Sequence, residues 1–542
     1  MLEIHVSNID SFILGDVPAP VLYDLVNTCS YSILGANFSA AGKEQWCPLC
    51  KKQAYTEAEV RVEEARRLKC DPSDITLEQF PLGKLYCKKH GFITPIKLWD
   101  GGVSLFNKTS LTFPSGILTK VVGVLRKHNA DFILKDNRIR PVTHSIPLQG
   151  VTLRDYQKNA VDAICGAGKG GRGTLRLITG AGKTLIIAGI TAELGVKTLI
   201  MVPSRTIFLQ VYERLSKFLK VPIGRIGDAE CDIQDITVAM PQSLTTSEKV
   251  KKNKYNPTKR RWEVTTINKV VIREKYVDYL KTVECFIMDE CHHAAADTFL
   301  CVSNTLPNAY FRVGLTSTHF RDDQADILID AFSGRRLVDV CARDLINLGY
   351  LSKPTIHMVP FKHKALPKKL NYAAAYSEHI VNNDRRNQLV VNIIVEQVNS
   401  GKSVLVPVRY INHGEVLALM LKKHLGRKVA FVSGESTSKE LTTAVKKLQK
   451  KQLMCLISTS VLGEGADVPS IDCVVMCGSV KSGVQALQNV GRALRRTEDK
   501  NTVEIFDIAD YGCRWFGEHS RIRKLFYQSE PGFEIVEDLE RE

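Results

Sequence analysis

The segment Leu175-Arg-Leu-Ile-Thr-Gly-Ala-Gly-Lys-Thr184 joins an apolar run, a glycine-rich turn and the start of a helical pattern. This order is typical of a phosphate-binding loop, because the N–H groups of the turn and the positive end of the helix face the anion. The longer consensus begins with a glycine where this chain has Leu177, so the residues alone also allow an ordinary turn. We predict a nucleotide-binding loop in which Lys183 reaches the terminal phosphates and Thr184 holds Mg²⁺. Its remaining members are Thr179, Gly180, Ala181 and Gly182.

A second apolar run ends in two adjacent carboxylates about a hundred residues later, in Glu284-Cys-Phe-Ile-Met-Asp-Glu-Cys-His-His293. An aspartate at the end of a buried strand suits Mg²⁺, and the next glutamate can orient an attacking water molecule. A bare Asp-Glu pair is usually only solvated. Its position after a strand and downstream of the predicted loop makes Asp289 and Glu290 catalytic candidates, with Asp289 also a magnesium ligand.

Short apolar runs alternate with amphipathic segments on both sides of this pair, in one block over 150–340 and a second over 345–515. Such alternation is typical of parallel sheets that are covered by helices on both faces. We predict an α/β fold with two tandem doubly wound domains. A smaller α+β domain over 1–145 precedes them, and a tail over 516–542 follows.

Composition limits the classes of protein to which the chain can belong. Its 542 residues suggest several domains, and 44% hydrophobic and 24% charged residues are ordinary for globular proteins. No apolar run approaches twenty residues, and the amino terminus lacks a basic region followed by an apolar core. We therefore expect no membrane span, no secretory signal and a cytoplasmic location. The formal net charge of +16 favours a polyanionic partner such as nucleic acid.

The two segments quoted above, with six others, resemble the motifs of superfamily 2 helicases in their usual order. Asp289-Glu290-Cys291-His292 matches the DECH form of the second motif. The other matching segments are Leu153-Arg-Asp-Tyr-Gln157, Met201-Val-Pro-Ser-Arg-Thr206, Pro241-Gln-Ser-Leu244, Gly314-Leu-Thr-Ser-Thr-His-Phe-Arg-Asp-Asp323, Ser458-Thr-Ser-Val-Leu-Gly-Glu-Gly-Ala-Asp-Val-Pro469 and Gln488-Asn-Val-Gly-Arg-Ala-Leu-Arg495. The resemblance covers about 150–510 and implies two RecA-like lobes with ATP and Mg²⁺ in the cleft between them.

The resemblance also implies roles for residues outside the loop. Arginines of the last motif neutralise charge on the transferred phosphoryl group, which indicates Arg495, with Arg492 as its neighbour. The remaining implied nucleotide contacts are Gln488, Gly465, Asp467 and the adenine-reading Gln157, although a glutamine in the place of Gln157 can instead cap a helix. The chain departs from the family pattern at Ile178, Ser317 and His319, none of which carries the chemistry.

Two pairs of metal-binding type lie in the amino-terminal region, Cys47-Pro-Leu-Cys50 and Cys87-Lys-Lys-His90. Three thiolates and one imidazole form a closed tetrahedral shell that suits structural Zn²⁺. We predict a zinc site of Cys47, Cys50, Cys87 and His90 in an insertion over about 45–92. The alternatives are two unrelated pairs, with Cys70 as a substitute ligand, or a redox pair.

The surroundings of these pairs resemble the N-terminal domain of phage UvsW-type recombination helicases and their XPB-like relatives. The matching segments are Leu98-Trp-Asp-Gly101 and Phe113-Pro-Ser-Gly-Ile-Leu118. The resemblance implies a domain that binds branched or duplex DNA. The two pairs interrupt it, because Ile33–Ser39 and Phe92–Gly101 would otherwise join.

A basic run follows the Pro241-Gln-Ser-Leu244 segment. Seven of the thirteen residues in Lys249–Arg261 are basic, and Tyr255 and Trp262 accompany them. Cations and aromatic rings together suit contact with a single strand, although such runs are often only solvated loops. Asn256-Pro257 marks a turn, which predicts a hairpin near the path of the strand.

We therefore expect an ATP-dependent DNA helicase or translocase that unwinds or branch-migrates forked and recombination intermediates. The expected partners are single-stranded, forked or branched DNA and proteins of recombination or replication, without a membrane. For a phage-encoded chain the location would be the host cytoplasm. A DECH-type RNA helicase and a nucleic-acid-binding protein with weak ATPase activity remain the alternatives. The oligomeric state stays open.

Overall fold

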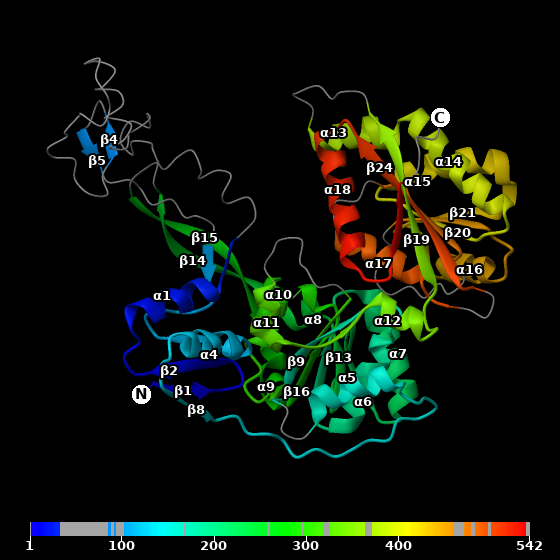
Figure 1. The fold of residues 1–542 in the computed structure, drawn as a ribbon. Coiled ribbons are helices and arrows are strands. Elements are labelled where there is room, and N and C mark those ends of the chain that lie inside the picture. The colour runs from blue at the N-terminus through cyan, green and yellow to red at the C-terminus, as the bar shows by residue number, and fades with distance from the viewer. Residues whose placement is uncertain are drawn as a thin grey trace.

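The computed structural model of the chain describes residues 2–32, 85–87, 91–93, 102–166, 170–256, 261–293, 296–317, 326–363, 371–459, 471–478, 483–496 and 500–537. These residues form two α/β lobes and a smaller N-terminal domain beside the first lobe (Figure 1). None of the described helices combines the length and the apolar character that crossing a bilayer needs.

The first lobe is built on a parallel sheet with the order β12-β11-β13-β10-β16-β17-β9-β18, in which only β12 is antiparallel to its neighbour. Its strands are β9 (Arg172–Leu177), β10 (Thr198–Met201), β11 (Ile223–Gly227), β12 (Glu230–Asp232), β13 (Ile236–Ala239), β16 (Cys285–Met288), β17 (Phe311–Thr316) and β18 (Arg336–Val340). Its helices are α5 (Asp155–Cys165), α6 (Lys183–Leu194), α7 (Arg205–Leu219), α8 (Pro241–Leu244), α9 (Val277–Thr282), α10 (Asp297–Ser303), α11 (Ile327–Ser333) and α12 (Ala342–Asn347). The central strands are buried along their whole length, which explains their continuous apolar sequence.

The second lobe is a fully parallel sheet with the order β21-β22-β20-β23-β24-β19-β25. Its strands are β19 (Lys353–Lys362), β20 (Val404–Pro407), β21 (Val429–Val432), β22 (Cys455–Ser458), β23 (Cys473–Met476), β24 (Thr502–Tyr511) and β25 (Glu534–Glu537). Its helices are α13 (Tyr372–Tyr376), α14 (Asp384–Asn399), α15 (Ile411–Leu425), α16 (Ser438–Gln449), α17 (Gly483–Ala493) and α18 (Arg514–Ser529). The prediction of two tandem doubly wound lobes is confirmed.

Both sheets follow one plan. Leaving aside the edge strand β12, numbering the strands of each lobe in chain order gives the sheet order 3-4-2-5-6-1-7 in both lobes. Strand β9 of the first lobe therefore corresponds to β19 of the second, and β10 corresponds to β20. This correspondence lets residues of the two lobes be compared by topological position.

The prediction of a tail over 516–542 is wrong for the residues that the structure describes. Helix α18 packs on β24 and α17, and β25 joins the sheet as a parallel neighbour of β19. The sequence carries no apolar signal for β25, because it is an edge strand with only half-buried or exposed side chains.

The N-terminal domain is a four-stranded sheet with the order β7-β2-β1-β8, covered by two helices. Its elements are β1 (Leu2–Val6), β2 (Asp10–Leu14), α1 (Ala19–Thr28), β7 (Thr112–Pro114), the 3₁₀ turn η2 (Ser115–Ile117), α4 (Leu118–Lys127) and β8 (Phe132–Asp136). A separate antiparallel pair, β3 (Ser30–Ser32) and β6 (Gly102–Ser104), brings residue 32 opposite residue 102. The chain between them therefore leaves and re-enters the domain at one point, as expected for an insertion. It includes the hairpin of β4 (Leu85–Cys87) and β5 (Gly91–Ile93).

The N-terminal domain is docked on α11 of the first lobe through the segment that resembled the UvsW-type domain. A Cβ at Gly116 would overlap the backbone carbonyls of Asp330 and Ala331 on α11, so only glycine allows this approach. Lys120 forms an ion pair with Asp330 beside it, at 3.3 Å.

The basic run forms a long antiparallel ribbon, as the turn signal predicted. Its strands are β14 (Thr245–Asn256) and β15 (Arg261–Ile272), paired along all twelve residues of each strand. The ribbon projects from the first lobe directly after α8 (Figure 1). Its described middle part, including Lys249, Lys251 and Lys269, is exposed to solvent.

Candidate active site

The predicted phosphate-binding loop lies between β9 and α6 at the carboxyl edge of the first sheet. Gly180 and Gly182 adopt left-handed φ angles of 95° and 81°, which glycine takes up without strain. The loop turns the chain so that α6 begins at Lys183 with its amino end toward the loop. The first N–H groups of a helix have no partner within the helix, which makes this end suited to phosphate.

Lys183 and Glu290 form a buried ion pair next to the loop. Burial lowers the pKa of Lys183, but Glu290 and Asp289 outweigh it, so the net pKa lies above its usual value. Burial raises the pKa of Glu290, but the Lys183 ammonium outweighs it and the net pKa is depressed. Both groups are therefore charged at neutral pH. An incoming phosphate would take over the Lys183 contact and release Glu290.

Asp289 and Glu290 lie at the end of β16, where the sequence predicted them. Both are buried, with 4% and 8% of their surface exposed. Glu290 has a left-handed φ of 51°, a strained conformation for a residue with a side chain, and such strain concentrates at functional sites. The backbone N–H of Glu290 donates to Oδ1 of Asp289 at 3.0 Å, which holds the Asp289 carboxylate against the Glu290 backbone.

The end of β17 and the next residue, Ser317, contact His292 and Glu290. The Ser317 hydroxyl donates to Oε2 of Glu290 at 3.5 Å, and Nδ1 of His292 lies 3.3 Å from Oγ1 of Thr316. His292 also lies 3.4 Å from Oε2 of Glu290. Ser317 departs from the family pattern, and the hydrogen bond gives the departure a physical role, because alanine could not donate it. His319 lies outside the described residues.

Gln157 of α5 contacts the phosphate-binding loop. Its Oε1 accepts the backbone N–H of Arg154 in a capping box of α5, which confirms the helix-cap alternative. Its Nε2 donates at 3.1 Å to the carbonyl of Ala181 in the loop, and the Tyr156 hydroxyl donates to the same carbonyl at 2.9 Å. Contact of Gln157 with adenine stays a prediction.

The second lobe reaches the loop through α17. A Cβ at Gly491 would lie only 2.4 Å from Cβ of Thr179, so the helix backbone packs directly on the loop. Arg495 follows this helix, and its Cγ lies 3.9 Å from the place of a Cβ on Gly180. Burial, together with the positive charge of Arg214 on α7, lowers the pKa of Arg495 to about 10. The predicted arginine finger is therefore beside the loop of the opposite lobe.

The other predicted site residues divide into two groups. Thr184 is half-buried in the first turn of α6, and Gln488 is buried in α17. For Arg492 and Cys87 the structure gives only the backbone, in α17 and β4. Cys47, Cys50, His90, Gly465 and Asp467 lie outside the described residues. The described part of the chain contains no group of three side chains able to hold a metal, and this leaves the zinc site untested.

Sequence reasoning missed one contact between the lobes. Arg176 on β9 forms a buried ion pair with Glu530, which follows α18. Oε1 of Glu530 also accepts the N–H of Ala342 at 2.8 Å at the start of α12, and the N–H of Arg343 donates to Pro531 at 2.9 Å. The sequence signal was Arg176 between Leu175 and Leu177 of a strand, because an arginine that a strand buries needs a partner.

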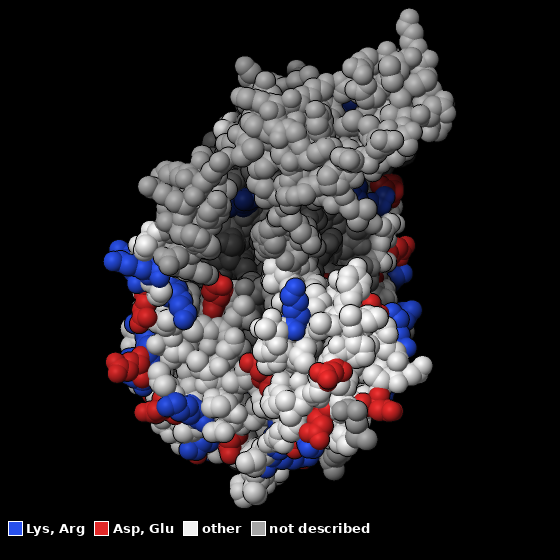
Figure 2. Space-filling view, turned by 90° about the vertical axis from the view of Figure 1, so that its left-hand side faces the viewer, with Lys and Arg blue, Asp and Glu red and all other residues white. Residues whose placement is uncertain are grey.

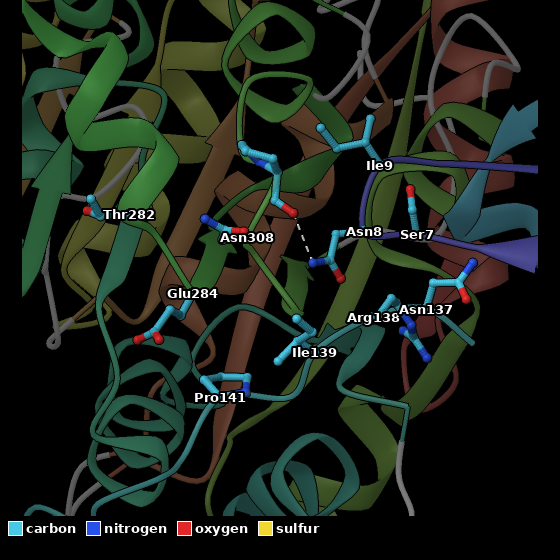
Figure 3. A pocket seen from close by; sticks show the side chains of 11 residues that line it. Ser7, Asn8, Ile9, Asn137, Arg138, Ile139, Pro141, Thr282, Glu284 and Asn308 are labelled. Carbon is cyan, nitrogen blue, oxygen red and sulfur yellow. Dashed lines mark hydrogen bonds between the residues drawn. The ribbon is translucent and has the colours of Figure 1, made fainter. Parts of the chain in front are cut away.

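A cavity of about 450 Å³ lies where the N-terminal domain meets the amino ends of the first sheet. The side-chain amide of Asn8 donates to the carbonyl of Pro307 at 2.9 Å. Asn8, Arg138 and Glu284 are among the residues that line the cavity (Figure 3). The cavity is at the amino edge of the first sheet, whereas the phosphate-binding loop, Asp289 and Glu290 lie at the carboxyl edge. Figure 2 shows the side on which the N-terminal domain lies, where basic and acidic side chains are interspersed over the described surface.

Two family models match the lobes. The type III restriction enzyme res subunit matches residues 150–321, and the helicase conserved C-terminal domain matches residues 385–497. The chain contains the two domains of a superfamily 2 helicase. It therefore carries the motor of an ATP-dependent helicase, as the order of its motifs predicted. The DECH spelling of the second motif is consistent with this assignment.

The related proteins include viral, archaeal and phage helicases. The chain is 25% identical over 392 residues to the putative helicase 22 of a Sulfolobus islandicus filamentous virus, covering 67% of this chain and 65% of the relative. It is 24% identical to the DNA 3'-5' translocase XPB2 of Sulfurisphaera tokodaii, covering 69% and 85% of the two chains. It is 26% identical to the ATP-dependent DNA helicase uvsW of Enterobacteria phage T4, covering 41% and 45%. The resemblance to UvsW-type and XPB-like proteins is thus confirmed.

A solved structure shares the fold. A putative HsdR subunit of a type I restriction enzyme from Vibrio vulnificus matches 73% of this chain and 68% of its own length, with a TM-score of 0.51 and 18% identity.

Proposed function

We propose that this protein is an ATP-dependent DNA helicase or translocase that remodels forked and recombination intermediates. The observation that carries the proposal is the assembly of one site from both lobes. The Lys183–Glu290 ion pair is buried in the first lobe, and the helix that leads to Arg495 packs on the same loop from the second. A site divided in this way couples nucleotide chemistry to movement between lobes.

The side chains at this edge fit ATP and Mg²⁺. Mg²⁺ held by Thr184 and Asp289 would neutralise phosphate charge. Lys183 would bind the terminal phosphates, and Glu290 would orient the attacking water once phosphate has replaced its contact with Lys183. Arg495 would stabilise the charge that develops on the transferred phosphoryl group. Arg492, Gln488, Gly465 and Asp467 are proposed as further nucleotide contacts on the family pattern.

DNA rather than RNA is the proposed substrate because named DNA helicases and translocases, XPB2 and uvsW, are among the relatives. The net charge of +16 supports a nucleic acid of either kind. By the same resemblance, movement is proposed to run 3' to 5'. A DECH-type RNA helicase would use the same catalytic residues and is the rival.

The β14–β15 ribbon is proposed as a DNA contact outside the motor. It follows α8, whose Pro241-Gln-Ser-Leu244 sequence resembles a strand-contacting motif. Residues 245–272 contain eight basic and two acidic residues, a net charge of +6. A two-stranded ribbon gains little stability by itself, so an exposed one is more readily explained by a bound partner.

A structural zinc ion in the N-terminal insertion remains a proposal from the sequence alone. We expect one equivalent of zinc per purified chain, and its loss in a Cys47→Ser, Cys50→Ser variant. Elemental analysis that finds no zinc in the intact chain would remove this part of the proposal.

The function is tested by unwinding of a fluorescently labelled forked DNA with ATP and Mg²⁺. We expect strand separation by the wild type and none by Lys183→Ala. A matched RNA fork serves as the second substrate. Unwinding of RNA alone would assign the chain to the rival class, and absence of unwinding and of ATP turnover with both would leave a nucleic-acid-binding protein.

A further inference from the structure

Strand β20 of the second lobe corresponds to β10 of the first, and the pattern Val-Pro-x-Arg occurs near the end of each strand. Val202-Pro-Ser-Arg205 directly follows β10, whereas Val406-Pro-Val-Arg409 begins within β20 and ends two residues after it. A long helix follows in both lobes: α7 begins at Arg205 itself, and α15 begins at Ile411, two residues after Arg409. Ligands of open α/β sheets bind at the carboxyl ends of the strands, so both arginines stand on the binding edge of their lobe.

The two arginines differ in their surroundings. Arg205 is held by a carboxylate, with Nε 2.6 Å and Nη2 3.0 Å from the oxygens of Asp228. Arg409 is held by aromatic rings instead. Its guanidinium lies 5.6, 5.8 and 5.4 Å from the ring centroids of Tyr372, Tyr376 and Tyr410.

These rings form a supported, partly exposed aromatic surface. Tyr376 is the buried base, with its hydroxyl donating to the Gly478 carbonyl at 3.0 Å. Tyr410 packs against it nearly perpendicularly, with centroids 5.0 Å apart, and leaves 39% of its surface exposed. Tyr372 accepts a hydrogen bond from Nη1 of Arg409 at 3.1 Å and meets Trp515 of α18 edge-on at 6.0 Å.

We propose that Tyr410, held by Arg409 and Tyr376, is a stacking platform for a nucleobase of the single strand that the motor follows. The proposal rests on the proposed function. A π-face with an adjacent cation accepts any base, because stacking needs no particular hydrogen-bond pattern. The residue directly before the helix is Tyr410 in the second lobe and Ser204 in the first, so the equivalent position of the first lobe carries no ring. The base contact is therefore specific to the second lobe.

The test compares binding of an ordinary oligonucleotide with that of an abasic one of equal length and charge. Wild-type protein should bind the ordinary strand more tightly. Tyr410→Leu should lose roughly 5- to 150-fold of the affinity for the ordinary strand, the range for one stacked base, and little for the abasic strand. Tyr410→Phe keeps the ring and should behave as wild type. A 2-aminopurine strand should show stacking-dependent quenching with wild type and Tyr410→Phe only.

The outcomes separate this inference from the proposed function. Equal affinity loss of Tyr410→Leu for both strands, or quenching that persists in it, would overturn the platform and leave Tyr410 with a structural role. Thermal unfolding of each variant excludes misfolding as the cause. ATP turnover that no DNA stimulates in the wild type would overturn the proposed function itself. If DNA stimulates ATP turnover in the wild type but Tyr410→Leu keeps the wild-type preference for ordinary over abasic strands, only the platform would be overturned.

Discussion

The contact between α17 and the phosphate-binding loop predicts a strong effect of one added methyl group. In Gly491→Ala the new Cβ would lie 2.4 Å from Cβ of Thr179, whereas ordinary contacts begin near 3.4 Å. The helix must therefore retreat from the loop by about 1 Å, and Arg495 at its end moves with it. A misplacement of about 1 Å at a catalytic group costs on the order of a hundredfold in rate. We expect kcat for ATP hydrolysis to fall by about that factor, while the affinity for ATP changes little.

Two further variants make the assay specific. Gly123→Ala adds the same methyl group to α4, where nothing lies within 4 Å, and should turn over ATP as wild type does. Thr179→Gly combined with Gly491→Ala removes the colliding side chain and should recover part of the lost rate, which a general folding defect would not allow. A Gly491→Ala protein with kcat within threefold of wild type would refute the reasoning, because it would mean that α17 does not rest on the loop during turnover.

Three further predictions concern Glu290, Asp510 and the ribbon lysines. Glu290→Gln should lower kcat for ATP hydrolysis by about 10²- to 10⁴-fold, and it should tighten ATP binding because Lys183 loses its competing carboxylate. Steady-state turnover measures kcat, and ATP titration measures the affinity. A tenfold or smaller loss of kcat speaks against Glu290 as the residue that orients the attacking water. Burial raises the pKa of Asp510, but Arg386 and His363 outweigh burial and hold this pKa at about 2. Ionised Asp510 therefore stabilises the fold fully above the pKa of about 3.8 that it has in the unfolded chain, and this contribution is lost as the pH falls toward 2. Asp510→Asn should lower the free energy of unfolding at pH 7 by about 2 to 5 kcal/mol and by less in acid; a difference that stays constant down to pH 3 contradicts this. Replacing the ribbon lysines Lys249, Lys251 and Lys269 by alanine should reduce the slope of log binding constant against log salt concentration by about 2 to 3. The control replaces three exposed lysines at the end of α16, Lys446, Lys447 and the following Lys450, and should leave the slope unchanged. Equal slopes for the two triple variants would remove the ribbon from the DNA contact.

The sequence predicted those parts of the site that depend on neighbouring residues. The loop from Thr179 to Thr184 was predictable because phosphate binding needs consecutive small residues between a strand and a helix. Asp289 and Glu290 were predictable because they directly follow an apolar run that reads as a buried strand. The ribbon was predictable from the turn at Asn256-Pro257.

The contacts that escaped prediction join residues far apart in the chain. The Arg176–Glu530 ion pair spans more than three hundred residues, and Glu530 lies in the stretch that the sequence analysis assigned to a tail. The pairing of β25 with β19 likewise leaves no local trace, since an edge strand needs no apolar pattern. Arg409 and its tyrosines could have been noticed from the repeated Val-Pro-x-Arg. The aromatic support comes from α13 and from the loop before α15, and only the fold unites them.

The central claim is that one ATP site, shared by both lobes, is controlled by DNA. Steady-state ATP hydrolysis without nucleic acid, with single-stranded DNA, with forked DNA and with matched RNA tests it most directly, with Lys183→Ala and Arg495→Ala as controls. We expect strong stimulation by single-stranded or forked DNA that both substitutions abolish. Stimulation by RNA in preference to DNA, or full activity of Arg495→Ala, would contradict the claim.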